Sequence, residues 1–115
     1  MLASVIGAAA LYHYGADLVR VVDGDTVHLD IDAGFYMHRA DQSYRLLRIN
    51  APELRYPEGK ASRQALVDYL AGKALIVRTY KGDNFGRYLV ELWADGVNVN
   101  DWMVINGSAA YKEYA

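Results

Sequence analysis

The chain has 115 residues, of which 53% are apolar and 23% charged, a composition that predicts one globular domain and excludes the disordered and fibrous classes. It contains no cysteine, which excludes disulfides and thiolate metal sites. The net charge of −2 argues against a general polyanion binder, but residues 51–87 carry seven Lys and Arg against four Asp and Glu, and such a basic segment can attract an anionic substrate.

Residues 1–16 contain no Asp, Glu, Lys or Arg. The segment is shorter than the ~20 apolar residues that a membrane helix needs, and it lacks the basic leader of a secretory signal. We therefore expect an uncharged N-terminal strand or arm that makes no contact with a membrane. The alternative is a remnant of a targeting segment, and secreted and cytoplasmic locations both stay open.

Three strands are predicted in the first half of the chain, at residues 18–22, 26–32 and 44–49. The second of them has the clearest pattern, because Val27, Leu29 and Ile31 alternate with polar residues. Asp23 and Gly24 form the turn before it. Residues 35–42 are expected to form the tip of a long hairpin that leads into the third strand.

The spacing of apolar residues changes to a helical period after Pro57, and Gly72 with Lys73 fits the end of that helix. Strands at residues 74–80 and 88–94 follow. A second short helix is predicted within residues 97–107, with Asn98 or Asn100 as its cap and Gly107 just past its end. This order predicts a mainly β (α+β) fold, a five-stranded barrel of the oligonucleotide-binding (OB) type with two or three attached helices.

Two charged residues occupy positions that the strand pattern assigns to the apolar side. Arg45 shares its spacing with Leu47 and Ile49, and Asp25 shares its spacing with Val27 and Leu29. Arg45 either extends its head to water at a strand end or lies at the barrel rim, where its planar fork suits an anion. Asp25 either belongs to an ordinary turn or, if buried, needs a cation or a metal beside it.

Two further charged residues follow in loops. Glu53 comes directly after Pro52, eight residues after Arg45, which is close enough for both side chains to border one cleft. Arg87 ends the turn at residues 81–87. Each of these charges taken singly is typical of a solvated loop.

Four segments together carry a resemblance: "VVDGDTVHL", "YRLLRINAPE", "DNFGR" and "DGVNVNDWMVINGSAAY". In order and approximate spacing they resemble the staphylococcal nuclease (thermonuclease) family, over about residues 18–114 of one nuclease-like domain. The resemblance implies that Asp25 is a calcium ligand and that Arg45 and Arg87 bind the scissile phosphate. It also implies that Glu53 orients or deprotonates the attacking water.

The chain departs from the pattern of that family at several site positions. Asn50 stands where the family usually has a second calcium-binding aspartate, and Ala51 stands where a backbone carbonyl joins the coordination shell. Phe85 replaces a tyrosine. Phe85, Tyr111 and Tyr114 are the aromatic residues that we expect to stack on nucleic-acid bases.

The function that the resemblance implies is a metal-dependent endonuclease that hydrolyses phosphodiester bonds of DNA and RNA and leaves 3′-phosphate and 5′-hydroxyl ends. Ca²⁺ is the expected cofactor, with other divalent ions as alternatives. We expect a monomer that binds single- or double-stranded nucleic acid through its phosphates. The alternative is a nucleic-acid-binding module of weak or no activity, because Asn50 removes a metal-binding carboxylate.

Overall fold

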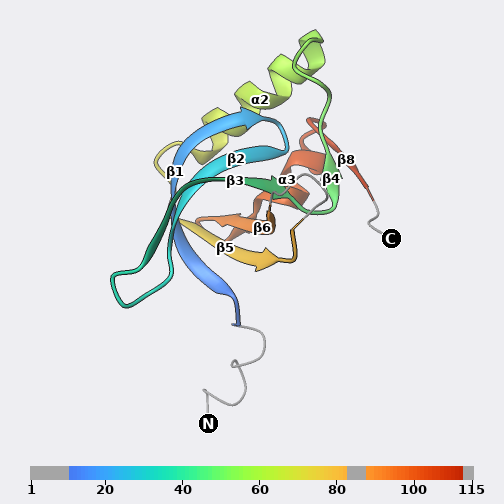
Figure 1. Ribbon diagram of the computed structural model, residues 1–115. Helices are drawn as coiled ribbons and strands as arrows, with labels where there is room; N and C mark the ends of the chain where they lie inside the picture. The colour runs from blue at the N-terminus through green and yellow to red at the C-terminus, as the bar shows by residue number, and fades with distance from the viewer. Residues whose placement is uncertain (1–10, 83–87, 113–115) are drawn as a thin grey trace.

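In the computed structural model, residues 11–82 and 88–112 are described, and they fold around a closed five-stranded barrel (Figure 1). The strands lie in the order β3-β2-β1-β5-β6, and a parallel pairing of β3 with β6 closes the barrel, whereas the other pairs are antiparallel. The bounds are β1 (His13–Asp23), β2 (Thr26–Asp32), β3 (His38–Leu46), β5 (Leu75–Tyr80) and β6 (Tyr88–Ala94). The predicted OB-type barrel is confirmed.

Two helices and three short strands complete the described residues. Helix α2 packs against β1, and α3 packs against β6 (Figure 1). The short strands β4 and β8 pair with each other, and β7 pairs with the end of β6. The bounds are β4 (Ile49–Asn50), α2 (Pro57–Leu70), β7 (Val97–Asn98), α3 (Val99–Ile105) and β8 (Ala110–Tyr111).

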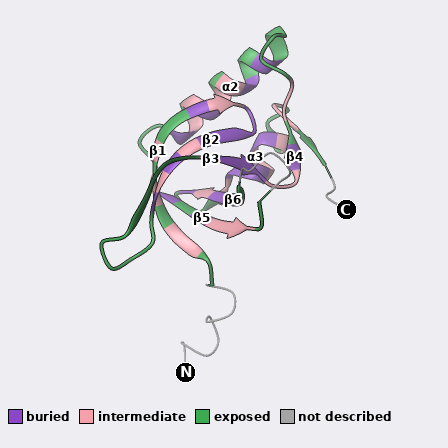
Figure 2. Ribbon diagram, viewed as in Figure 1, coloured by how far each residue is buried: buried purple, intermediate pink, exposed green. Residues whose placement is uncertain are grey.

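The core lies inside the barrel and under α2 and α3 (Figure 2). The alternation in β2 holds, because Val27 and Leu29 are fully buried and Ile31 nearly so, while Asp32 is exposed. Leu66 and Leu70 of α2 are buried as well. A strand that alternates in this way places its apolar side chains on the inner face of the sheet.

The boundaries of both helices agree with the sequence predictions. Pro57 begins α2, and Gly72 follows the helix with a φ of +71°, a left-handed conformation that glycine adopts without strain. Asn98 is the cap of α3, since its side chain accepts a hydrogen bond of 2.9 Å from the backbone N–H of Asp101. The cap is thus Asn98 and not Asn100.

Three strand boundaries were predicted wrongly. β1 begins at His13 and not at residue 18, so it includes the end of the segment expected to be an uncharged strand or arm, of which residues 1–10 lie outside the described residues. The hairpin tip is shorter than predicted, because β3 begins at His38 and pairs with β2 from there to Arg45, with one irregularity between Arg39 and Gln42. The first half of β3 is exposed on both faces, so it has no apolar alternation for sequence analysis to detect.

The predicted strand at residues 44–49 is broken in the middle. β3 ends at Leu46, and Arg48 has a φ of +72°, so the chain turns before Ile49 enters β4. A left-handed φ is uncommon for a residue with a side chain and persists only where the surroundings hold it. Ile49 is fully buried as the apolar spacing predicted, but Leu47 is only half-buried, and the core residues of β3 are Tyr44 and Leu46, which have the opposite spacing.

Among the described residues, the structure has no helix long and apolar enough to cross a membrane.

The cap of α3 gives a stability prediction. Asn98→Ala removes the bond to the Asp101 amide and also the bond that the Asn98 side chain donates to Glu91, so the free energy of unfolding should fall by at least the loss of about 0.5–2 kcal/mol typical of a missing cap. Urea denaturation measures the change. The matched control is Asn106→Ala, at the exposed end of the same helix, for which we expect a change within about 0.5 kcal/mol. Equal losses in the two variants would contradict the capping role.

Candidate active site

A buried ion pair joins the start of β2 to the end of β3. Nη1 of Arg45 lies 2.9 Å from Oδ2 of Asp25, and the two side chains are 10% and 6% exposed. Arg45 lies opposite Thr26 in the sheet. Because Asp25 directly precedes Thr26, its side chain is within reach of Arg45. The interpretation of Arg45 as a strand-end residue with its head in water is therefore wrong, and Asp25 meets the cation that its burial requires.

The carboxylate of Asp25 makes two further contacts. Its Oδ2 accepts a hydrogen bond of 2.9 Å from the backbone N–H of Ala51, and its Oδ1 accepts one of 3.1 Å from the Thr26 hydroxyl. Burial alone would raise the pKa of Asp25, but hydrogen bonds with Asp23 and Ala51 and the charge of Arg45 together hold that pKa below its ordinary value. Asp25 is therefore an anion at neutral pH.

Arg45 also holds the segment that follows β3. Its Nη2 donates to the backbone carbonyl of Ile49 at 3.1 Å and to Oδ1 of Asn50 at 3.2 Å. The side chains of Asp25, Arg45 and Asn50 and the backbone N–H of Ala51 thus meet at one place. A cavity of about 390 Å³ lies beside them, between residues 50–52 and residues 107–110.

Glu53 lies on the loop that leaves this cluster, but its side chain points to solvent. It is 67% exposed, and its Oε2 pairs with Nε of Arg55 at 2.7 Å. An exposed pair of this kind contributes roughly 0–1 kcal/mol, so it holds Glu53 only weakly. The structure places Glu53 near the cluster along the chain without a direct contact to Arg45 or Asp25.

The remaining predicted site residues divide into two groups. Tyr111 is described: it pairs with Ile49 across β4 and β8, and its ring is 56% exposed. The others lie outside the described residues, namely Phe85, Arg87 and Tyr114.

The family model described as staphylococcal nuclease homologue matches residues 43–115, which is more than half of the chain and includes the end of β3, the loop after it and both helices. The chain belongs to the staphylococcal nuclease family. Asp25 lies before the matched residues and is joined to them by its ion pair with Arg45.

Three relatives illustrate the range of the family. An uncharacterized endonuclease of Escherichia coli is 37% identical over 99 residues, which cover 84% of this chain and 61% of the relative. A probable staphylococcal-like nuclease of Oryza sativa subsp. japonica is 40% identical over 71 residues, 61% of this chain and 19% of the relative. Protein ParB of Escherichia coli is 30% identical over 118 residues, 94% of this chain and 63% of the relative. The chain thus spans about three fifths of the length of the bacterial relatives.

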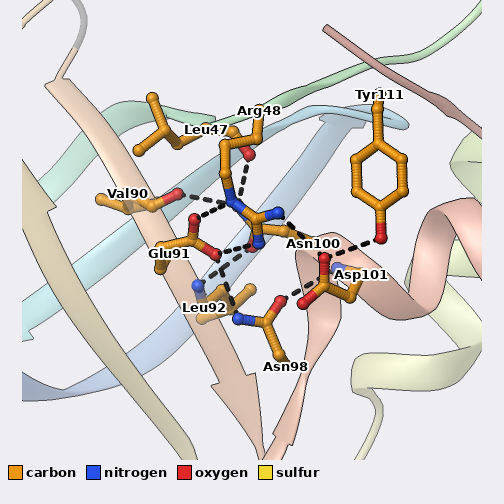
Figure 3. Close-up of polar contacts among 9 residues, drawn as sticks. All are labelled: Leu47, Arg48, Val90, Glu91, Leu92, Asn98, Asn100, Asp101 and Tyr111. Carbon is orange, nitrogen blue, oxygen red and sulfur yellow. Dashed lines mark hydrogen bonds and ion pairs between the residues drawn. The ribbon is translucent and has the colours of Figure 1, made fainter. Parts of the chain in front are cut away.

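A polar network on the other side of the turn fixes the course of the chain between Arg45 and Asn50. Its centre is Arg48, whose Nε and Nη2 donate to the two oxygens of Glu91 at 2.6 and 2.8 Å and whose Nη1 donates to Asp101 at 3.0 Å (Figure 3). Asn98 and Tyr111 complete the network, since they donate to Glu91 and Asp101 respectively. These five residues are called the Arg48 network below.

The Arg48 network joins the turn to β6, α3 and β8. Its bidentate contact with Glu91 has the geometry of a strong charge-assisted pair, and the hydrogen bonds to Glu91 and Asp101 raise the pKa of Arg48. Asn100, which is fully buried, donates to the carbonyls of Leu47 and Val90 and holds the same turn from inside (Figure 3). These contacts account for the left-handed φ of Arg48.

Two glycines let the site segments approach one another, a role that the sequence analysis did not give them. A Cβ on Gly24 would collide with Oγ of Ser62 in α2 and with the side chain of Ala51. A Cβ on Gly59 would collide with the backbone carbonyl of Glu53. At Gly24 the turn before β2 lies close to α2 and to the site loop, and at Gly59 α2 lies close to the site loop. Only a residue without a side chain fits at either place.

Asp23 is a third residue that the sequence analysis assigned only to a turn. Burial and the neighbouring Asp25 raise the pKa of Asp23 to about 6, because two carboxylates so close together repel each other. Its Oδ1 accepts a hydrogen bond of 3.0 Å from the backbone N–H of Asp25. Asp23 therefore adds a second carboxylate beside the Asp25–Arg45 pair.

The oxygen donors near Arg45 are chemically suited to a hard divalent cation. They are the carboxylates of Asp23 and Asp25 and the amide oxygen of Asn50, and such oxygens are the preferred ligands of Ca²⁺ and Mg²⁺. Within residues 11–82 and 88–112 no group of three or more His, Cys, Asp or Glu side chains lies together. A cation here would need water or other oxygens for the rest of its coordination shell.

The close approach at Gly59 gives a second stability prediction. Gly59→Ala should lower the free energy of unfolding by up to about 2 kcal/mol, because overpacking of roughly 1–3 kcal/mol exceeds the gain in helix propensity of about 1 kcal/mol. Urea denaturation measures it. Gly15→Ala in β1 is the control, since an added Cβ there meets nothing within 4 Å. A Gly59→Ala protein more stable than the unmodified one would show that the loop moves without cost.

The Arg48 network gives a prediction for acid unfolding. Hydrogen bonds from Arg48 and the Tyr111 hydroxyl lower the pKa of Asp101. A carboxyl group whose pKa is lower in the folded chain stabilises the fold above its unfolded pKa of ~3.9, and this stabilisation disappears as the pH falls through the folded pKa. The stability difference between the unmodified protein and Asp101→Asn should thus be constant from about pH 5 to 7 and shrink below about pH 4.

Urea denaturation at several pH values checks this expectation. Glu58→Gln, an exposed carboxylate of α2 outside the Arg48 network, is the control for the loss of one negative charge. If the curves of the unmodified protein and Asp101→Asn stay parallel to pH 3, the ion pair with Arg48 does not stabilise the fold.

Proposed function

We propose that this protein is an endonuclease that hydrolyses phosphodiester bonds of DNA and RNA with the help of a divalent cation. The single observation that carries the proposal is the buried Asp25–Arg45 pair and its contacts with Asn50 and Ala51, in a chain of the staphylococcal nuclease family. The names of the relatives as endonuclease and staphylococcal-like nuclease support it. The product ends would be 3′-phosphate and 5′-hydroxyl, and Ca²⁺ is the first cation to test.

In this proposal Arg45 binds the scissile phosphate. Hydrolysis places negative charge on the phosphate oxygens, and one well-aimed donor at such developing charge supplies roughly 3–4 kcal/mol. The contact of Arg45 with neutral Asn50, at 3.2 Å, is the one that a charged phosphate oxygen would displace first. Arg87 is the proposed second phosphate ligand, and the residue after it, Tyr88, pairs with Tyr44, the residue before Arg45.

Asp25 has two parts in the proposal. It fixes the guanidinium of Arg45, and with Asp23, Asn50 and Ala51 it would hold the cation. The cation, when bound, would supply positive charge that stabilises the phosphate in the transition state. Both parts need an ionised carboxylate, which the low pKa of Asp25 supports.

Glu53 is the proposed residue that orients or deprotonates the attacking water. Its exposure is compatible with that task, because catalytic contacts in a free enzyme often form only when the substrate is bound. Tyr111, with Phe85 and Tyr114, is proposed to stack on bases; the exposed ring of Tyr111 leaves a face for such contact.

The second candidate function is a binding module that holds nucleic acid without cleavage. One observation favours it: the amide of Asn50 accepts a hydrogen bond from Arg45, and at this position the chain has no carboxylate to bind a cation. A neutral amide contributes less to cation affinity than a carboxylate does. Both functions use the same barrel and the same phosphate contacts.

One set of assays separates the two candidates. The protein is incubated with single-stranded DNA and Ca²⁺, with and without chelator, and cleavage is followed by electrophoresis. For a nuclease, chelator abolishes cleavage and Glu53→Gln slows it by about 10²–10⁴-fold. Because Glu53 is exposed, this variant should fold normally, whereas loss of Arg45 would leave Asp25 buried without its cation at a cost of about 3–5 kcal/mol.

The control variant is Glu58→Gln, which removes an exposed carboxylate five residues away. It should cleave at the unmodified rate. Binding of DNA without cleavage in Ca²⁺, Mg²⁺ and Mn²⁺ would instead establish the binding module.

A further inference from the structure

A cavity of about 220 Å³ opens at one mouth of the barrel. All five barrel strands contribute to its wall, which shows that it is the open end of the barrel and not a surface groove. Of the candidate active-site residues that the structure describes, none lines it. The residues on its wall include Tyr14, Ile31, Arg39, Tyr44, Thr79 and Tyr88. This cavity is called the Tyr44 pocket below.

The hydroxyl of Tyr44 makes no hydrogen bond of normal geometry with a described residue, although the side chain is only 1% exposed. A buried donor without a partner is costly, and native proteins contain few of them. Burial raises the pKa of Tyr44, an effect that the nearby Arg39 partly offsets through its charge and its approach to the hydroxyl oxygen, so the phenol keeps its proton. Arg39 can only donate, so it offers the hydroxyl hydrogen no acceptor. The pocket therefore contains a hydrogen-bond donor that lacks an acceptor.

Two aromatic rings and a planar guanidinium lie in the wall of the same pocket. The rings of Tyr44 and Tyr88 lie 6.3 Å apart at an angle of 37°, and the guanidinium of Arg39 lies 4.6 Å from the centre of the Tyr88 ring. Tyr88 is 39% exposed and Arg39 is exposed, so both are accessible from solvent. Nucleobases stack on aromatic rings and on guanidinium planes alike.

Size and charge restrict the ligand further. The pocket is smaller than the roughly 300–1,000 Å³ typical of sites for drug-sized molecules, so it suits one small planar ring system. The ligand must offer an acceptor to Tyr44, and Arg39 at the rim favours negative charge next to that ring. An unpaired nucleobase attached to its phosphate has all three properties.

We propose that the Tyr44 pocket binds one unpaired base of a single-stranded nucleic acid, with the Tyr44 hydroxyl donating to the base and Arg39 facing the backbone phosphate. The inference rests on the proposed function and narrows its substrate to single strands, because a base in a duplex cannot enter the pocket. Tyr44 and Arg45 are consecutive in β3, so the base pocket and the phosphate site lie on neighbouring residues of one strand.

Two variants test the pocket, each with a matched control. Tyr44→Phe removes only the unpartnered oxygen and keeps the ring, so the melting temperature should not fall. Arg39→Gln removes the charge at the rim. The controls are Tyr80→Phe and Arg78→Gln, because Arg78 also stacks on a tyrosine, Tyr80, at 4.0 Å, but neither residue lines the pocket.

Binding is measured by fluorescence anisotropy with a labelled single-stranded oligonucleotide and with its duplex, in chelator so that no cleavage occurs. Tyr44→Phe and Arg39→Gln should each weaken single-strand binding about fivefold or more, the factor that one hydrogen bond supplies. The controls should change it less than about twofold, and Tyr44→Phe should leave duplex binding unchanged. Equal single-strand affinity in Tyr44→Phe and the unmodified protein would overturn the proposal.

Nuclear magnetic resonance locates the site directly. Thymidine 5′-monophosphate should shift the amide signals of Arg39, Tyr44 and Tyr88, and inorganic phosphate should not. The same shifts with phosphate alone would show an anion site and refute base binding. If the protein does not cleave but Tyr44→Phe weakens single-strand binding, the nuclease proposal fails and the base pocket stands. If the protein cleaves and Tyr44→Phe leaves single-strand binding unchanged, the base pocket fails and the nuclease proposal stands.

Discussion

The buried pair of Asp25 and Arg45 is the constraint on which the site depends. Breaking such a pair leaves an uncompensated charge in the interior at a cost of about 3–5 kcal/mol, so neither residue can change alone. The pair also fixes register: Arg45 reaches Asp25 only when it lies opposite Thr26, which is the pairing of β2 and β3 in the structure. The same interaction thus aligns two barrel strands and positions the proposed phosphate ligand.

A second charged cluster holds the backbone that leaves this pair. Arg48 turns the chain by a left-handed φ, and its guanidinium contacts β6 through Glu91 and α3 through Asp101. The two arginines, three residues apart, therefore have separate tasks, because Arg45 faces the site and Arg48 faces the scaffold. The loop with Asn50 and Ala51 follows directly after Arg48 and is held by Arg45 and Asp25.

Sequence patterns predicted what depends on local order and missed what depends on distant contacts. The apolar spacing around Arg45 and Asp25 correctly indicated two buried charges, and Pro57 and Asn98 correctly marked helix starts. The turn at Arg48 was missed because its cause, Glu91, lies 43 residues away. The roles of Gly24 and Gly59 were missed for the same reason, since each depends on a neighbour that only the folded chain brings close.

Strand alternation explains how one short segment of β3 can carry two kinds of site. Side chains of successive strand residues point to opposite faces, so Tyr44 and Leu46 enter the barrel while Arg45 between them meets Asp25. The aromatic donor at the barrel mouth and the cation beside the carboxylates therefore lie on consecutive residues of β3. Bases and phosphates alternate along a nucleic-acid strand as well, so in the proposed complex one single strand offers a base to Tyr44 and a phosphate to Arg45.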